Sequence, residues 1–130
     1  MTGDENTYRL VRLPGAAIVE LVGAHDLSTV SALREVFSLL VTGPDLIVVD
    51  VTETEFIDMS VLGGLVSLDR DVQKRGGQFR LQLGPSRIVW RVLEITGLFY
   101  HFEVVQTREA ALRLISRNAP PCPRSDADAT

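Results

Sequence analysis

The sequence predicts a single α/β domain in which helices pack on a mixed sheet. Three observations support this prediction. The run Leu46–Val51, which is apolar except for Asp50, has the composition of a strand that is covered on both faces. An amphipathic helical pattern follows it, and strand and helix patterns alternate along the chain. With 130 residues and 45% hydrophobic content, the chain can bury one core but has no room for two domains.

The first part of the chain predicts a hairpin followed by a helix. Tyr8–Leu13 and Ala16–Val22 are short strand patterns on either side of the turn dipeptide Pro14-Gly15. Leu27–Val41 has a helical pattern, and Gly43-Pro44 ends it. The apolar face of this helix consists of Val30, Leu33, Phe37 and Leu40, and Asp26 or Ser28 is available as its N-cap.

The central part predicts a strand, a helix and a second strand. Thr52–Asp58 is polar and short, as expected for a connection from Leu46–Val51 to the helix. Gly76-Gly77 ends the helix, and Gln78–Leu83 then alternates like a half-buried strand. A right-handed crossover makes the two strands parallel. The apolar stripe of the helix consists of Val61, Leu65, Leu68 and Val72.

The last part predicts a third helix, a short strand and a fourth helix. Ser86–Thr96 is a helix that ends at Gly97 and carries Ile88, Val92 and Ile95 on one side. Phe102–Gln106 is a strand pattern, and Thr107 is a good N-cap for a helix through about Ser116. We therefore expect a folded domain over residues 1–116 and a disordered, proline-containing tail over residues 117–130.

Composition excludes several classes of protein. A formal net charge of −4 argues against a nucleic-acid binder. No apolar run approaches the ~20 residues of a membrane span, and Met1–Leu10 is acidic and polar, unlike a secretion signal. The single cysteine, Cys122, excludes an internal disulfide and a multi-cysteine zinc site. We expect a cytoplasmic protein with no nucleic-acid partner and no membrane insertion.

No enzyme or cofactor site can be recognised from residue spacing. The chain has no nucleophile elbow, no Walker-type glycine loop and no Ser/His/Asp set. His25 and His101 are far apart in the sequence and have no cysteine or carboxylate at ligand spacing. We expect a binding protein without catalytic activity, cofactor or metal ion.

The start of the central helix, Phe56–Gly63, is the most informative segment. A helix N-terminus has unpaired N–H groups and positive potential. Asp58 and Ser60 are both suitable caps for this first turn, and the same geometry favours a phosphate on Ser60. We therefore expect the functional site at this helix start.

Several motifs, in order, resemble the STAS family, whose best-known members are anti-sigma factor antagonists of bacteria. The family's hallmark is a strand, a polar connection, Asp-Ser-Ser/Thr-Gly-Leu-Gly, a helix, Gly-Gly and a strand. The resemblance covers about Ala16–Ile115 and is more specific than any single motif. The matching segments are Leu46–Val51, Asp58, Leu62-Gly63, Gly76-Gly77, Pro85-Ser86-Arg87, Leu93–Phe99 and the turn Val22–Leu27.

The resemblance implies a sheet of about five strands with about four helices, mostly on one face. It also implies that the chain binds an anti-sigma factor, which in this family can be a serine kinase, and so frees a sigma factor for transcription. Docking would use the surfaces 24–29 and 55–66. The partner-binding residues implied are Asp26, Asp58, Met59, Ser60 and Leu62.

The chain departs from the family at the phosphorylated position. The family's kinase modifies the Ser directly after the motif Asp, and here that residue is Met59, which cannot accept phosphate. One alternative is that Ser60 has become the phosphate acceptor, and its other role is a helix cap. A second is constitutive partner binding without a switch. A third is a non-phosphorylated STAS subunit of a lipid-transport ABC complex. Met59 itself fills a gap in the core or lies partly exposed at an interface.

Overall fold

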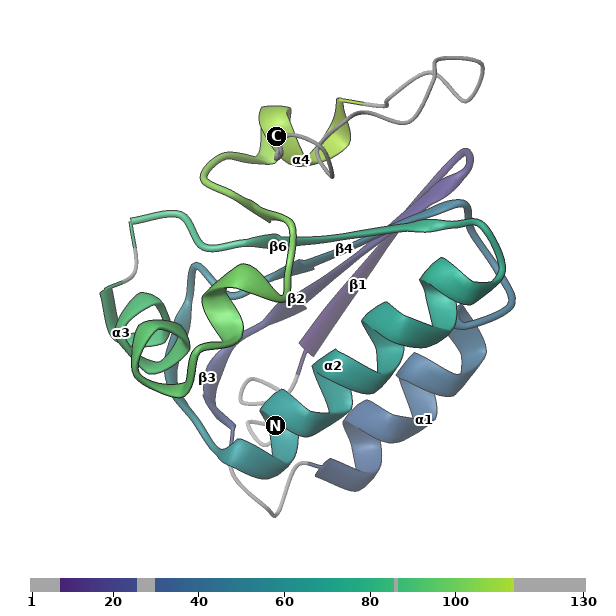
Figure 1. The fold of residues 1–130 in the computed structure, drawn as a ribbon. Coiled ribbons are helices and arrows are strands. Elements are labelled where there is room, and N and C mark those ends of the chain that lie inside the picture. Colours follow the sequence, from purple (N-terminus) through teal and green to yellow (C-terminus); the bar gives the residue numbers. More distant parts are fainter. Residues whose placement is uncertain (1–7, 26–29, 86, 114–130) are drawn as a thin grey trace.

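The computed structural model describes residues 8–25, 30–85 and 87–113. Its main sheet has five strands in the order β1-β2-β4-β6-β7, and a second sheet pairs β3 with β5 (Figure 1). This confirms the predicted α/β domain with a mixed sheet. The strands are β1 (Tyr8–Leu13), β2 (Ala16–Leu21), β3 (Gly23–His25), β4 (Leu46–Asp50), β5 (Thr54–Ile57), β6 (Gln78–Gln82) and β7 (Val104–Val105).

The register of the main sheet follows from its turns and crossovers. β1 and β2 form the predicted antiparallel hairpin, in which Leu13 pairs with Ala16 across the turn. Gly15 has φ +75 there, a conformation that favours glycine. β2, β4, β6 and β7 are parallel, as right-handed crossovers require. The carboxyl ends of these four strands therefore lie at one edge of the sheet.

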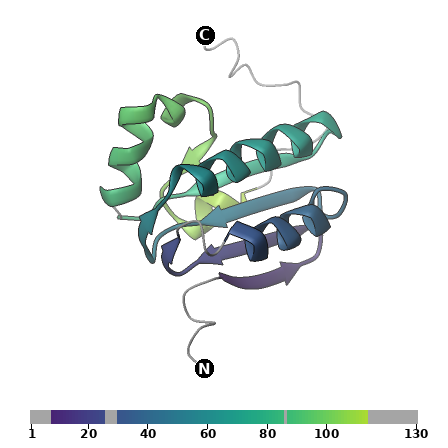
Figure 2. The ribbon, with the colours of Figure 1, turned by 90° about the horizontal axis from the view of Figure 1, so that it is seen from below.

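Helices cover the two faces of the sheet unequally. α1 and α2 lie side by side on one face, α3 and the short 3-10 helix η3 lie at the edge of this layer, and α4 covers the other face (Figures 1 and 2). Alternate residues of β2 and β4 point into the two resulting cores. The helices are α1 (Val30–Leu40), α2 (Met59–Lys74), α3 (Arg87–Thr96), η3 (Leu98–Tyr100) and α4 (Arg108–Leu112).

The polar connection before α2 contains a strand that the sequence pattern did not predict. Thr54–Ile57 forms β5 and pairs in parallel with Gly23–His25, a segment that the resemblance assigned to a turn. Thr54 is buried, and its hydroxyl donates to the Leu21 carbonyl at 3.0 Å. The expectation of an unpaired connection over 52–58 was wrong because pairing between distant segments, rather than local composition, forms this strand.

The ends of the helices follow the predicted signals where the structure describes them. Gly76 ends α2 with φ +86, and the Gly77 N–H donates to the Val72 carbonyl at 2.9 Å. A Cβ at Gly77 would lie 2.9 Å from the Val72 side chain and 3.1 Å from the Asp45 carbonyl, so the packing around this glycine is tight. Thr107 caps α4 by accepting from the Ala110 N–H at 3.1 Å. The fourth helix, expected through Ser116, extends to Leu112, and residues 114–130 lie outside the described part.

The third helix turns a different side to the core than its apolar residues suggested. Val89 and Leu93 are buried, whereas Ile88 is 50% and Ile95 77% exposed. Trp90 packs against Phe99 of η3, with 4.8 Å between the ring centroids. α3 lies at the edge of the layer, so only a narrow stripe of it is covered.

No helix in the described residues is long and apolar enough to cross a membrane.

Candidate functional site

The start of α2 is capped by Asp58. The carboxylate of Asp58 accepts a hydrogen bond from the Ser60 backbone N–H at 3.0 Å. The Ser60 hydroxyl donates a second hydrogen bond to the same carboxylate oxygen at 2.7 Å. Of the two capping residues that the sequence allowed, the structure selects Asp58, and Ser60 is the second residue of the helix.

These hydrogen bonds keep the cap ionised. The hydroxyl of Ser60, followed by the backbone N–H groups of Ser60 and Met59, lowers the pKa of Asp58 below its ordinary value. The positive end of the helix dipole also favours a carboxylate at this position. As a result, the half-buried Ser60 hydroxyl is held against a negatively charged group.

Two apolar side chains lie exposed beside the cap. Met59 is 57% exposed, as its position at the helix start predicted, and Phe56 is 49% exposed. Ile57, between them, is 5% exposed and belongs to the core. Large exposed apolar side chains are candidates for an interaction surface. Phe56 lies within the predicted docking surface 55–66 but was not one of the individually predicted contact residues.

Leu62, which we predicted to contact a partner, is fully buried in the structure. It has no exposed surface and packs in the main core. The core-facing arc of α2 is wide because both the sheet and α1 cover the helix, and Leu62 falls inside this arc beside Val61. A residue in this position stabilises the helix start from below and presents no surface to solvent.

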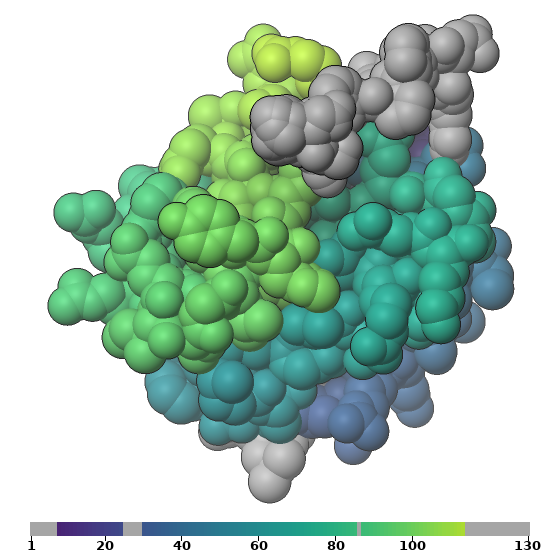
Figure 3. Space-filling model, in the orientation of Figure 1, coloured from purple at the N-terminus to yellow at the C-terminus, as the bar shows by residue number. Residues whose placement is uncertain are grey.

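The structure brings the two predicted docking segments together. β3 and β5 end side by side, because His25 pairs with Ile57 immediately before the Asp58 cap. Asp26, the predicted contact residue that follows His25, lies outside the described residues. In the space-filling view the beginning of α2 reaches the lower surface of the molecule, next to the α1 segment (Figure 3).

A small, half-open hollow lies between α1 and α2 next to Ser60. Sequence reasoning did not identify it, because its walls come from two helices that are distant along the chain. The hollow is mostly apolar and also includes one arginine and Ser60. Its lining residues are Val30, Leu33, Arg34, Phe37, Ser60, Val61 and Gly64. The surface beside the start of α2 is therefore slightly recessed.

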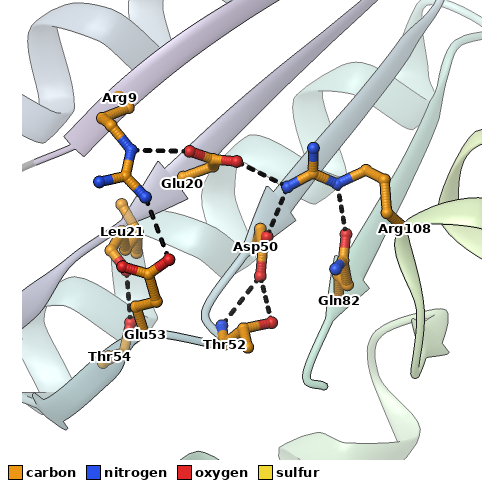
Figure 4. Close-up of polar contacts among 9 residues, drawn as sticks. All are labelled: Arg9, Glu20, Leu21, Asp50, Thr52, Glu53, Thr54, Gln82 and Arg108. Atoms are coloured by element: carbon orange, nitrogen blue, oxygen red, sulfur yellow. Dashed lines mark hydrogen bonds and ion pairs between the residues drawn. The ribbon is translucent and has the colours of Figure 1, made fainter.

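A second polar cluster lies at the carboxyl edge of the sheet (Figure 4). Glu20, Asp50 and Gln82 are neighbours across β2, β4 and β6. Arg108 of α4 lies over them and donates to Glu20 at 2.7 Å, to Asp50 at 2.6 Å and to Gln82 at 3.0 Å. Arg9 adds a hydrogen bond to Glu20 at 2.8 Å.

The polar groups of this cluster form their hydrogen bonds with one another and with Thr52. Burial opposes the ionisation of Glu20, but hydrogen bonds and charges from Arg108 and Arg9 outweigh it and lower the pKa of Glu20. The other carboxylate, Asp50, accepts from the Thr52 N–H at 2.9 Å and from its hydroxyl at 2.5 Å. Each acidic group is engaged by partners of the chain itself, and through Arg108 the cluster fixes α4 to the sheet.

The described residues contain no group of three or more His, Cys, Asp or Glu side chains that could hold a metal ion. His101 lies beside a carboxylate distant in sequence, with 3.4 Å between its Nε2 and Asp69 Oδ2. This contact connects the segment after η3 to α2.

A family model described as STAS domain matches residues 7–111. Among curated protein sequences, none matches significantly. An anti-sigma factor antagonist from Mycobacterium paratuberculosis is similar in structure, with a TM-score of 0.74 and 24% identity over 82% of this chain and 90% of that one.

Two structures of SpoIIAA are also similar. The unphosphorylated form of this anti-sigma factor antagonist has a TM-score of 0.71 and 21% identity over 85% of this chain and 100% of that one. The phosphorylated form, described as a Bacillus cell fate determinant, has a TM-score of 0.64 and 20% identity over 80% of this chain and 96% of that one. At these identities the similarity establishes a common fold.

Proposed function

The chain belongs to the STAS domain family, and on this basis we propose that it is an anti-sigma factor antagonist, which binds an anti-sigma factor and so frees a sigma factor. The observation that carries the proposal is the start of α2. Exposed Met59 and Phe56 flank a capped helix end that carries Ser60, on the fold of known antagonists. Docking occurs through this surface.

We propose further that Ser60 is the phosphate acceptor when the partner is a serine kinase. The nearby hydroxyls are placed less favourably. Thr54 is buried, Thr52 precedes the helix in the connection, and Ser67, although exposed, lies two turns inside α2, away from its positive end. Ser60 is half-buried at the surface, and its proton already points to the Asp58 carboxylate. A phosphate here adds about −1.5 to −2 charges beside Met59 and weakens apolar docking.

Affinity purification from the native cell tests the proposal. The tagged wild-type chain and Met59→Asp are expressed at equal levels, and bound proteins are identified by mass spectrometry. We expect an anti-sigma factor with the wild type and much less of it with the variant. Recovery of a lipid-transport ATPase in its place would contradict the proposal and support a transporter-subunit role. Recovery of equal anti-sigma factor with both chains would move the docking surface elsewhere.

A further inference from the structure

The short connection between β4 and β5 carries the strand that leads to the docking surface. β4 ends at Asp50, β5 begins at Thr54, and the Asp58 cap of α2 follows β5 directly. A displacement of this connection would therefore move β5 and the exposed side chains around the cap. The contacts that hold the connection in place decide how well the docking surface is preformed.

The side chain of Asp50 shapes this connection. Its Oδ1 accepts a hydrogen bond from the Thr52 backbone N–H at 2.9 Å and a second one from the Thr52 hydroxyl at 2.5 Å. The first of these is the hydrogen bond of an Asx turn, in which an aspartate side chain bonds the backbone two residues further on. The Thr54 N–H then donates to the Val51 carbonyl at 3.0 Å. The orientation of the Asp50 carboxylate therefore sets the path of the chain from β4 into β5.

Arg108 of α4 fixes that orientation from the other side of the sheet. Its Nη2 donates to Asp50 Oδ2 at 2.6 Å, so the two oxygens of this carboxylate bind different partners (Figure 4). The same nitrogen donates to Glu20 Oε2 at 2.7 Å. Without the guanidinium, two carboxylates on adjacent strands would face each other, since Glu20 and Asp50 are paired in the register of β2 and β4. Their repulsion would act on the carboxylate that holds Thr52.

Thr52 is closely packed and has little freedom to follow such a movement. A Cβ at Gly84 would lie 2.5 Å from the Thr52 hydroxyl oxygen, so the Thr52 side chain occupies space that only a glycine leaves open. Gly84 itself is buried, and its φ of +60 favours glycine. A movement of Thr52 is therefore passed on to the backbone of the connection, because close packing limits a change of its rotamer.

We propose that Arg108 is a positioning residue for the docking surface and acts through Asp50 and Thr52 on β5 and the start of α2. This inference rests on the proposed function for the identity of the partner. Because coupling between two sites is reciprocal, docking at the start of α2 also stabilises α4 on the sheet. The face of the sheet opposite to α2 is thus a place from which the docking affinity can be changed.

Arg9 provides a contrast within the same cluster. It donates to Glu20 at 2.8 Å and to Glu53, in the connection, at 3.1 Å. The side chains of Arg9 and Glu53 are 55% and 59% exposed, and exposed ion pairs contribute little. Asp50 is buried, so solvent screens its contact with Arg108 much less. We therefore expect the path through Asp50 to dominate.

NMR of the full chain tests the positioning without a partner. Amide chemical shifts are compared between the wild type, Arg108→Gln, Thr52→Val and Arg9→Gln, the last being the same chemical change at the exposed arginine. We expect Arg108→Gln and Thr52→Val to shift the amides of residues 56–60 and Arg9→Gln to leave them unchanged. Arg108→Lys keeps a positive charge beside Asp50 and should restore most of the wild-type shifts. Unchanged resonances at 56–60 in both Arg108→Gln and Thr52→Val would overturn the proposal.

Titration of the purified anti-sigma factor separates this inference from the proposed function. We expect Arg108→Gln and Thr52→Val each to weaken its binding about fivefold, within the range for residues that are coupled to a site without touching the ligand. Because both act through Asp50, the double variant should bind about as weakly as either single one. If Met59→Asp weakens binding but these two variants bind like the wild type, or if their effects multiply, the inference fails alone. If Met59→Asp also binds like the wild type, the docking surface itself is wrong.

Hydrogen exchange of the wild-type chain checks the reciprocal effect and requires no variant. The Ala111 N–H donates to the Thr107 carbonyl at 2.9 Å within α4, on the face of the sheet opposite to α2 (Figure 2). We expect this amide to exchange more slowly when the anti-sigma factor is bound at the start of α2. Equal exchange of the Ala111 amide in the free and bound chain would contradict the coupling.

Discussion

The carboxylate of Asp58 accepts two hydrogen bonds from Ser60, one from its backbone N–H at 3.0 Å and one from its hydroxyl at 2.7 Å. This pair joins two roles in one contact. It satisfies one of the unpaired N–H groups in the first turn of α2, and it orients the hydroxyl that we propose as the phosphate acceptor. The consequences can be tested separately for stability and for modification.

Removing the Asp58 cap should destabilise the chain. Asp58→Ala leaves the Ser60 N–H and hydroxyl without their acceptor, and Asp58→Asn keeps an acceptor oxygen but loses the charge that the helix dipole favours. We expect the denaturation midpoint, measured by circular dichroism, to decrease from the wild type to Asp58→Asn and further to Asp58→Ala. Thr107→Ala removes the cap of the short helix α4 and serves as a comparison. An unchanged midpoint for Asp58→Ala would show that the cap is dispensable.

Charging Met59 should weaken docking and leave the fold intact. Met59→Asp should lower the affinity for the anti-sigma factor by more than about 1 kcal/mol, because an unpaired charge would be desolvated in the interface. The variant should unfold like the wild type, since Met59 is 57% exposed. Leu39→Asp adds the same charge at a 68% exposed leucine of α1 and is the control. Calorimetric titration with the anti-sigma factor measures the affinities. Equal affinities of Met59→Asp and the wild type would exclude Met59 from the interface.

Leu62 should behave in the opposite way. Leu62→Ala removes a side chain with no exposed surface, so it should reduce the free energy of unfolding by about 3 kcal/mol. The affinity of the folded fraction should stay unchanged because Leu62 does not reach the surface. Urea denaturation gives the first quantity and calorimetry at low temperature gives the second. A loss of affinity without a loss of stability would restore Leu62 as a contact residue.

Phosphorylation by the cognate anti-sigma kinase should occur on Ser60. After incubation with ATP, peptide mass spectrometry should locate the phosphate there, and Ser60→Ala should not be modified. Ser67→Ala is the matched control. It should be modified normally, because Ser67 lies two turns from the start of α2 and is not the proposed acceptor. Phosphate on another residue would contradict a shifted acceptor, and no phosphate on the wild type would favour constitutive binding.

Acid should destabilise the chain through Glu20. Its pKa in the folded chain lies below the ordinary value of 4.5, so its ionised form stabilises the fold. This contribution is fully present above the unfolded pKa and is lost as the pH falls through the folded pKa. Below about pH 4.5 the stability of Glu20→Gln should therefore fall less steeply than that of the wild type. Denaturation at several pH values measures the slope, and Glu94→Gln, at an exposed glutamate of α3, should follow the wild type.

The candidate site could be predicted only in part from the sequence. Asp58 as a cap, Met59 as an exposed residue and Ser60 near the surface follow from the signals of a helix start. Leu62 was misplaced because a single apolar stripe underestimates a helix that is covered on two sides. The hollow between α1 and α2 could not be found from the sequence, because it depends on how two helices that are distant along the chain pack together.

The sequence by itself determined the class of fold, the order of its main elements and the ends of its central helix. These features depend on local patterns, namely the run Leu46–Val51, the period of α2 and the backbone freedom of Gly76. The tertiary structure alone decided the β3–β5 pairing, the side of α3 that is buried and the Arg108 cluster that fixes α4. Each of these depends on contacts between residues far apart in the chain, whose free energy of burial and pairing overrides local propensity.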